Sequence, residues 1–135
     1  MIYAVIDTNV LVSALWTTNP NSPTLAVLEG VFRGRITPLI HKDILREYDE
    51  VLHRSKFHFP TERIDTLMTY FAEHGILMDR TTFWDKMPDE DDRFFFEVSL
   101  TQEDSFLVTG NLKHYPRVPQ VVTPAEMVQI LSDRV

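Results

Sequence analysis

The sequence predicts an α/β fold with three layers, in which helices cover both faces of a mostly parallel central sheet. Short apolar segments with strand character alternate along the chain with longer segments of helical periodicity. In addition, polar side chains follow the first and fourth apolar segments, at Asp7 and Asn111. In a parallel sheet, such positions meet at the carboxyl edge, where ligands bind.

The first part of the chain predicts two strands with two helices between them. Residues 3–6 are an apolar strand, and apolar positions at helical spacing over residues 10–15 predict a helix directly after it. Ser22 is suited to cap a second helix, which has Pro23 as its first residue and ends near Gly34. The second strand follows at residues 35–40.

The middle of the chain predicts two amphipathic helices and a third strand. Apolar residues over 44–52 form one helical stripe, and Glu47 lies at the margin of that stripe. A second stripe covers residues 64–72, and Gly75 is placed to end that helix. Residues 76–78 then predict the third strand.

The last part of the chain predicts a helix, two strands and a final helix. Apolar spacing over residues 95–100 indicates the helix, residues 105–108 the fourth strand, and residues 121–122 a short edge strand. Residues 123–126 have the spacing of a capping box with proline just inside the helix, which predicts a final helix to about residue 131.

The composition limits the classes of protein that the chain can represent. Its 135 residues, without a repeat or linker, suit one domain that covers residues 1–135. The absence of cysteine excludes disulfides and cysteine zinc sites and fits the cytoplasm, and no apolar run is long enough for a signal peptide or a membrane span. A net charge of -7 disfavours nucleic acid unless metal ions or a basic surface offset it.

Acidic residues from three separate elements are predicted to meet at one edge of the sheet. Asp7 follows the first strand, Glu47 borders an inward stripe, and Asp92 lies above the inward face of the helix that follows it. Each has an ordinary alternative role: a helix cap, an exposed helix residue, or part of a solvated acidic loop over residues 89–92. Together they predict an all-oxygen site of the kind that Mg²⁺ or Mn²⁺ prefers. The histidines show no paired spacing of metal ligands.

Four motifs occur in a fixed order: VIDTNVL at residues 5–11, ILREY at residues 44–48, PDEDDRF at residues 88–94, and LVTGN at residues 107–111. Together they resemble the PIN domain, the metal-dependent ribonuclease fold of VapC-type toxins and of relatives of the flap endonucleases. The closing segments NLKHYP and VTPAE are similar to the subgroup described as toxin components of prokaryotic toxin–antitoxin systems.

The resemblance implies a PIN-like three-layer fold and a set of catalytic acids. The first acid of the family falls on Asp7, its helical glutamate on Glu47, and its later helix-start acid on Asp92, with Asp89 and Asp91 as substitutes. These acids would be both catalytic residues and ligands of Mg²⁺ or Mn²⁺. The activity implied is hydrolysis of RNA phosphodiester bonds by an endoribonuclease.

Asn111 is the one departure from the fullest family pattern, because a fourth aspartate is common at this position. Its amide oxygen can still bind a metal but brings no charge, which implies weaker affinity or one metal ion instead of two. The resemblance also suggests an antitoxin protein as partner and a homodimer, for which Trp16 or Phe57 are candidate contacts. The candidate substrate contacts near the motifs are Thr8, Asn9, Arg46, Arg93, Thr109, Lys113 and His114.

Other functions remain open at this stage. A non-catalytic PIN-like module that binds RNA or protein would use the same fold, with Asn111 as a sign of lost activity. A phosphatase of the haloacid dehalogenase class needs a second aspartate two residues after the first, where this chain has Asn9. A receiver domain needs a phosphoacceptor aspartate after a later strand, and the sequence has none.

Overall fold

The protein is a parallel α/β structure, seen here in a computed structural model that describes residues 1–134. Within those residues there is one five-stranded sheet in the order β3-β2-β1-β4-β5, and every pair of neighbouring strands is parallel. The strands are β1 (Ile2–Ile6), β2 (Ile36–Ile40), β3 (Ile76–Leu77), β4 (Phe106–Val108) and β5 (Val121–Val122).

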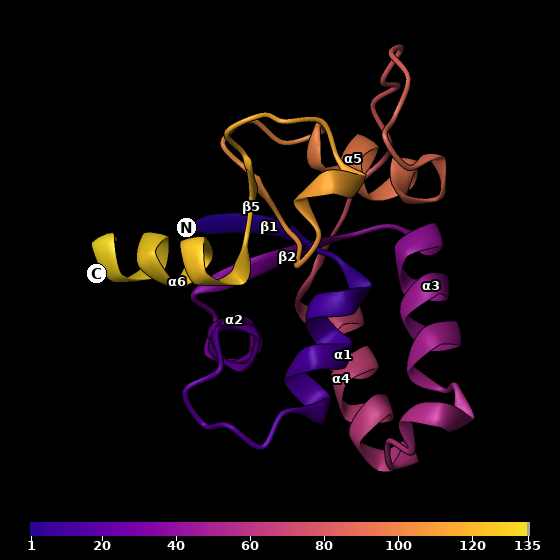
Figure 1. Cartoon of the computed structure of the whole chain (residues 1–135), viewed down its shortest axis with the longest axis vertical. Helices are drawn as coiled ribbons and strands as arrows, with labels where there is room; N and C mark the ends of the chain where they lie inside the picture. Colours follow the sequence, from indigo (N-terminus) through magenta and orange to yellow (C-terminus); the bar gives the residue numbers. More distant parts are fainter. Residues whose placement is uncertain (135) are drawn as a thin grey trace.

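Helices cover both faces of the sheet, so the predicted three-layer class is confirmed. In Figure 1, α1 to α4 lie below the sheet, α5 lies above it, and α6 packs beside α2. The helices are α1 (Thr8–Trp16), α2 (Pro23–Phe32), α3 (Lys42–Leu52), α4 (Thr61–His74), α5 (Arg93–Ser99) and α6 (Pro124–Asp133). Three short 3₁₀ helices join them: η1 (Ser55–Phe57), η2 (Glu90–Asp92) and η3 (Leu112–His114).

Local signals set most helix ends as the sequence predicts. The capping box of α6 is complete, since Thr123 accepts from the backbone of Glu126 and the Glu126 side chain bonds back to Thr123. Ser22 occupies the cap position of α2, but its hydroxyl bonds to Thr24 instead of the helix backbone. Gly75 ends α4, where a Cβ atom would lie 2.5 Å from a backbone oxygen of that helix. A side chain there would force the chain to shift.

The strand order creates a switch point beside β1. The chain moves outward from β1 through β2 to β3 and then returns to the other side of β1 for β4 and β5. The backbone N–H of Asp7 donates to the carbonyl of Val108 at 2.9 Å, so the segments that leave β1 and β4 are neighbours. Open parallel sheets bind ligands at such a point.

A buried tyrosine on α3 sets the position of that helix relative to β1. The Tyr48 hydroxyl donates to the carbonyl oxygen of Ile6 at 2.5 Å, and its ring packs edge-on against Phe71 at 5.6 Å between centroids. Tyr48 adjoins Glu47, and Ile6 adjoins Asp7. This single contact therefore brings two of the predicted acidic positions to the same side of the sheet.

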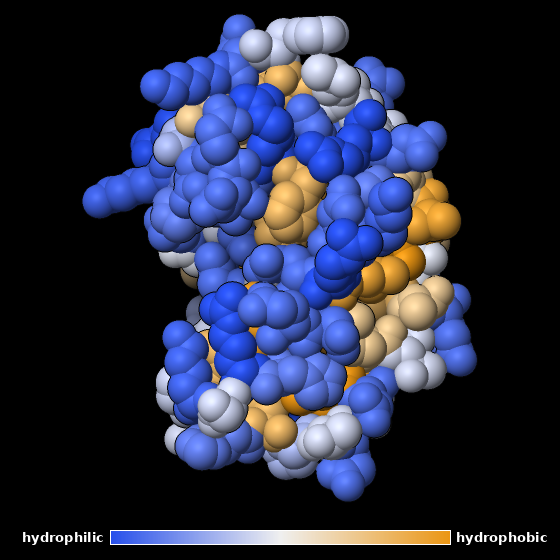
Figure 2. Space-filling model, turned by 90° about the vertical axis from the view of Figure 1, so that its right-hand side faces the viewer, coloured by the Kyte–Doolittle hydropathy of each residue, from blue (hydrophilic) through white to orange (hydrophobic). Residues whose placement is uncertain are grey.

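One face of the molecule is mainly polar. Figure 2 shows a face on which hydrophilic side chains dominate and apolar ones appear between them and along one margin. Within residues 1–134, no helix combines the length and the apolar character needed to cross a membrane.

Replacing Tyr48 with phenylalanine should lower the free energy of unfolding by about 1–3 kcal/mol, because the buried carbonyl of Ile6 loses a hydrogen bond. Chemical denaturation measures this change. Tyr3→Phe is the matched control, since Tyr3 is only partly buried. An equal loss in both variants would contradict a special role for the Tyr48 hydroxyl.

Candidate active site

One large cleft opens at the carboxyl edge of the sheet, bounded by α1, α3 and the segment around η2. Its volume is about 730 Å³, which is the size of an ordinary ligand site. Asp7, Glu47 and Asp92 all line it, so the three predicted acids come from separate elements to one space. The other lining residues are Thr8, Asn9, Val12, Ser13, Trp16, Thr17, Val51, Arg54, Phe57, Asp89, Asp91 and His114.

Asp7 is a buried carboxylate whose orientation is set by hydrogen bonds from neighbouring side chains. It occupies the cap position of α1, yet its side chain makes no capping hydrogen bond. Its Oδ2 atom instead accepts from the Thr109 hydroxyl at 2.8 Å, the Tyr115 hydroxyl at 2.9 Å and the Asn9 amide at 3.3 Å. The position matches the helix-cap alternative, but the two shortest side-chain contacts are with Thr109 and Tyr115, which lie outside the helix.

The electrostatic state of Asp7 is set by opposing effects. Burial raises the pKa of the Asp7 carboxyl, and the hydrogen bonds from Thr109 and Tyr115 oppose that rise. Burial, followed by the charge of Asp7, also raises the pKa of Tyr115, so this phenol stays protonated and remains a donor. Sequence reasoning missed Tyr115, because nothing local marks it as a neighbour of a residue 108 positions away.

The segment after β4 is tied to the start of α1 by a small network. Thr109 donates to Asp7 and also accepts from the backbone N–H of Asn111 at 3.0 Å. The backbone N–H of Gly110 donates to the Asn9 side-chain oxygen at 3.1 Å, and a Cβ atom at Gly110 would lie only 3.3 Å from that oxygen. Hydrogen bonds therefore join residues 7–9 to residues 109–111. Thr109 does not line the cleft but orients the Asp7 carboxylate that does.

Glu47 contributes a half-buried carboxylate beside an unsatisfied hydroxyl. Burial raises the pKa of Glu47, and the nearby Thr8 hydroxyl opposes the rise without reaching hydrogen-bond geometry. Among the residues that the structure describes, Thr8 Oγ1 is buried and has no hydrogen-bond partner. Because buried polar atoms are normally satisfied, a cation or a water in this cleft is the natural partner.

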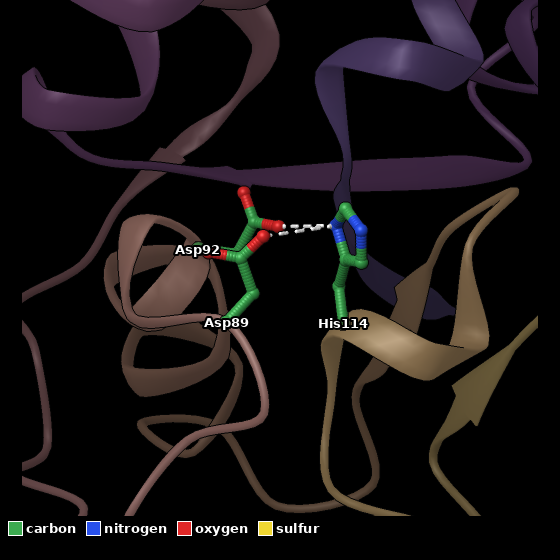
Figure 3. Close-up of side chains that lie close together, drawn as sticks. All are labelled: Asp89, Asp92 and His114. Carbon is green, nitrogen blue, oxygen red and sulfur yellow. Dashed lines mark hydrogen bonds and ion pairs between the residues drawn. The ribbon is translucent and has the colours of Figure 1, made fainter.

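Asp92 is joined to His114, as Figure 3 shows. The His114 Nδ1 atom lies 2.9 Å from Asp92 Oδ2 and 3.5 Å from Asp89 Oδ2, and its Nε2 atom lies 2.8 Å from the Asn111 amide nitrogen. An amide nitrogen only donates, so Nε2 accepts and Nδ1 carries the proton given to Asp92. Asp89, Asp92 and His114 each offer an atom within 4.8 Å of the others, so they would be close enough to share one ion once Nδ1 releases its proton.

The acidic block around η2 is divided between two environments. Glu90 faces outward, and the hydrogen bond from Arg93 lowers its pKa to about 2. Asp92 faces the cleft, where burial and then the charge of Asp7 raise its pKa to about 6. Arg93 also donates to the carbonyl of Phe83 at 2.6 Å, so it anchors the preceding loop and does not line the cleft.

The remaining predicted substrate contacts differ in position. Arg46 and Lys113 are exposed and lie outside the cleft lining, whereas Arg54 is part of it. Trp16 and Phe57, considered from the sequence only as dimer contacts, line the same cleft. Their place follows from how α1 and α3 pack, which their local sequence does not reveal.

The donor set fits a divalent cation. Five carboxylates, those of Asp7, Glu47, Asp89, Asp91 and Asp92, line one cleft in a chain of net charge -7. Burial raises the pKa values of Asp7, Glu47 and Asp92, and the charge of Asp7 adds to the rise at Glu47 and Asp92. Oxygen ligands with one imidazole suit Mg²⁺ or Mn²⁺ better than a thiolate-preferring metal.

Comparisons with known proteins agree with this architecture. A family model described as "PIN domain" matches residues 3–113. An uncharacterized protein of Methanocaldococcus jannaschii is 29% identical over 113 residues, which cover 82% of this chain and 71% of the relative. No solved structure gives a match. Since the family model matches most of the chain, from β1 to the segment after β4, the chain belongs to the PIN domain family, whose members are generally metal-dependent nucleases.

Proposed function

We propose that this chain is a cytoplasmic endoribonuclease that uses Mg²⁺ or Mn²⁺ to hydrolyse RNA phosphodiester bonds, as the toxin of a prokaryotic toxin–antitoxin system. The carrying observation is the convergence of Asp7, Glu47 and Asp92 in one cleft, where each carboxyl has a raised pKa. Carboxylates that are crowded and desolvated in this way have a strong tendency to bind a cation.

The same residues would hold the cation. Asp7, Glu47 and Asp92 are the proposed ligands, with Asp89 and His114 close enough to Asp92 to complete the set. When bound, a divalent cation supplies Lewis acidity for attack on a phosphodiester and offsets the negative charge of the cleft. This second effect matters because a phosphate must approach five carboxylates.

The protein's own residues then have separate tasks. Thr109 and Tyr115 fix the Oδ2 atom of Asp7, so that this carboxylate cannot rotate freely. The His114 Nδ1 proton is donated to Asp92 and orients that carboxylate toward the cleft. Asn111 supports His114 through its amide and remains a further candidate ligand.

The partners follow from the same proposal. An antitoxin protein would neutralise the nuclease, and a homodimer is proposed as its form in solution. The rival function is a non-catalytic PIN-like module that binds RNA or protein with the same cleft, and the experiment below separates the two.

Asp7→Asn should abolish metal-dependent RNA cleavage and remove most of the thermal stabilisation that Mn²⁺ gives the wild type. Asparagine can still accept from Thr109 and Tyr115 but lacks the charge that binds the cation. The unfolding temperature should rise with Mn²⁺ in the wild type, following ligand occupancy. A Mn²⁺ titration of unfolding temperature and of cleavage of a mixed RNA tests both effects.

Asp49→Asn is the matched control for this experiment, because Asp49 is an exposed aspartate on α3 outside the cleft. It should keep both the stabilisation by Mn²⁺ and the cleavage. If the wild type and Asp7→Asn were folded but equally inactive under every metal condition, the non-catalytic module would replace the nuclease.

Asp92→Asn should change how stability depends on pH in metal-free buffer. Because the folded-state pKa of Asp92 is about 6, against 3.8 for the unconstrained group, the wild type loses stability from this group as pH rises between these values. The amide does not ionise, so the variant escapes that loss. The difference in unfolding free energy, variant minus wild type, should therefore increase from pH 4 to pH 6 by at most about 2 kcal/mol.

Urea denaturation in EDTA at several pH values measures this difference. Glu73→Gln is the control, since Glu73 is exposed on α4 outside the cleft, and its difference should stay nearly constant. A flat or falling difference for Asp92→Asn would mean that the cleft does not oppose ionisation of Asp92.

A further inference from the structure

The cleft has a second end, away from the acids, which is lined by aromatic and basic side chains. Helix α1 begins at Thr8 beside Asp7 and ends at Trp16, which places Trp16 about 12 Å further along the helix axis. Arg54 and Phe57 follow the last turn of α3 and line the cleft together with Trp16. The cleft thus changes from acidic to aromatic along its length.

The aromatic end of the cleft is exposed, but its rings pack against one another. Trp16 is 59% exposed, although it touches the edge or face of Phe57 at 5.2 Å between ring centroids. Phe57 in turn stacks on Phe59 at 5.4 Å, and the Lys56 ammonium lies 5.1 Å from the centre of the Phe57 ring. These contacts hold the aromatic group in place and leave much of the indole free, which core packing does not explain.

We propose that Trp16 and Phe57 form a nucleobase-stacking subsite for single-stranded RNA. This inference rests on the proposed nuclease function and names the substrate class of the same cleft. Aromatic side chains stack on any unpaired base, because every base has a π-face, whereas the bases of a duplex are not available. Because Trp16 lies about 12 Å along α1 from its start beside Asp7, the stacked base would belong to a nucleotide that flanks the cleaved bond.

The charge pattern of the cleft favours RNA over a protein surface. An occupant that fills the whole space must offer flat apolar groups at one end and oxygen anions for a cation at the other, and a nucleotide chain offers both. Arg54 adds a guanidinium beside the aromatic rings, where it pairs with Glu50 at 3.0 Å. This pair is exposed and therefore weak, so a phosphate can take the place of Glu50. An apolar face of a second copy would leave the carboxylates buried without partners.

Binding can be measured without cleavage, so that the subsite is tested separately from catalysis. The probe is a short, end-labelled single-stranded RNA of mixed sequence, followed by fluorescence anisotropy at low salt. It is titrated with wild-type protein in EDTA and with Asp7→Asn protein in Mg²⁺. In both backgrounds Trp16→Ala should weaken binding about 5- to 150-fold, the effect of losing one stacked base. Trp16→Phe should lose much less.

The matched control is Trp84→Ala, because Trp84 is the other tryptophan, is 89% exposed and lies outside the cleft. It should leave the affinity unchanged. An RNA duplex of the same sequence should bind with no dependence on Trp16. Equal affinity of the wild type and Trp16→Ala for single-stranded RNA, or no binding by any protein with Trp16 intact, would overturn the subsite.

The oligomeric state provides a further decisive outcome. If Trp16→Ala converted a dimer to a monomer while RNA affinity stayed the same, Trp16 would belong to a protein interface and the subsite would be rejected. Trp16-dependent RNA binding without any cleavage by the wild type would retain the subsite and refute the nuclease. Cleavage by the wild type, together with unchanged RNA affinity in Trp16→Ala, would support the nuclease and reject the subsite.

Discussion

The burial of the Asp7 carboxylate is the constraint around which the rest of this structure is arranged. An ionised group that is 5% exposed is strongly destabilising unless it is hydrogen-bonded. Thr109 and Tyr115 supply those bonds from the segments after β4, so the two halves of the chain meet at this carboxylate. The strand order makes the meeting possible, because it places the exits of β1 and β4 side by side. Fold and site therefore depend on the same contacts.

The acids around η2 are less buried than Asp7 and differ from one another in their charged neighbours. Glu90 gains a cation, since Arg93 holds it at the surface, whereas Asp92 has only a shared proton from His114 and faces the charge of Asp7. Arg93 thus compensates the charge of an acid outside the cleft, whereas burial, followed at Asp92 by the charge of Asp7, disfavours ionisation of the acids inside it. A bound cation would favour their ionised forms and stabilise the folded protein.

Much of the fold was predictable because its signals are local. Helical stripes, the capping box at Thr123 and the stop at Gly75 act within a few residues, and each of these elements lies close to its predicted position. The third strand is one residue shorter than predicted, although the N–H of Met78 still donates to the carbonyl of Ile40. The alternation of strands and helices was enough to predict a parallel sheet.

The site was predictable only in part, for the opposite reason. Residues that directly follow a parallel strand lie at the carboxyl edge of the sheet, so this general rule was enough to place Asp7. Glu47 and Asp92 were predicted from helix periodicity and from the family resemblance. Tyr115 and the pairing of His114 with Asp92 depend on how the chain closes after β4, which no local pattern encodes.

Arg93 shows that a charge beside a motif can have structural partners of its own. Its neighbourhood in the sequence suggests a substrate contact, but its guanidinium donates to the loop before η2 and to Glu90. The arginine that does line the cleft, Arg54, lies outside the motifs, two residues beyond the end of α3. Proximity to a motif in sequence is therefore weaker guidance than the direction of the helix that carries the residue.

The direction of the two helices also explains why the cleft has two unlike ends. Both α1 and α3 start at the sheet edge and run away from it. Asp7 directly precedes α1 and Glu47 lies at the middle of α3, whereas the far ends of the two helices lead to Trp16, Arg54 and Phe57. The Tyr48 hydroxyl bonds α3 to β1, and Asp7, directly before α1, bonds to Thr109 and Tyr115, so both helices are anchored at the sheet edge. Because those anchors lie at the acidic end, changes at the aromatic end can alter what the cleft accepts without disturbing the carboxylates.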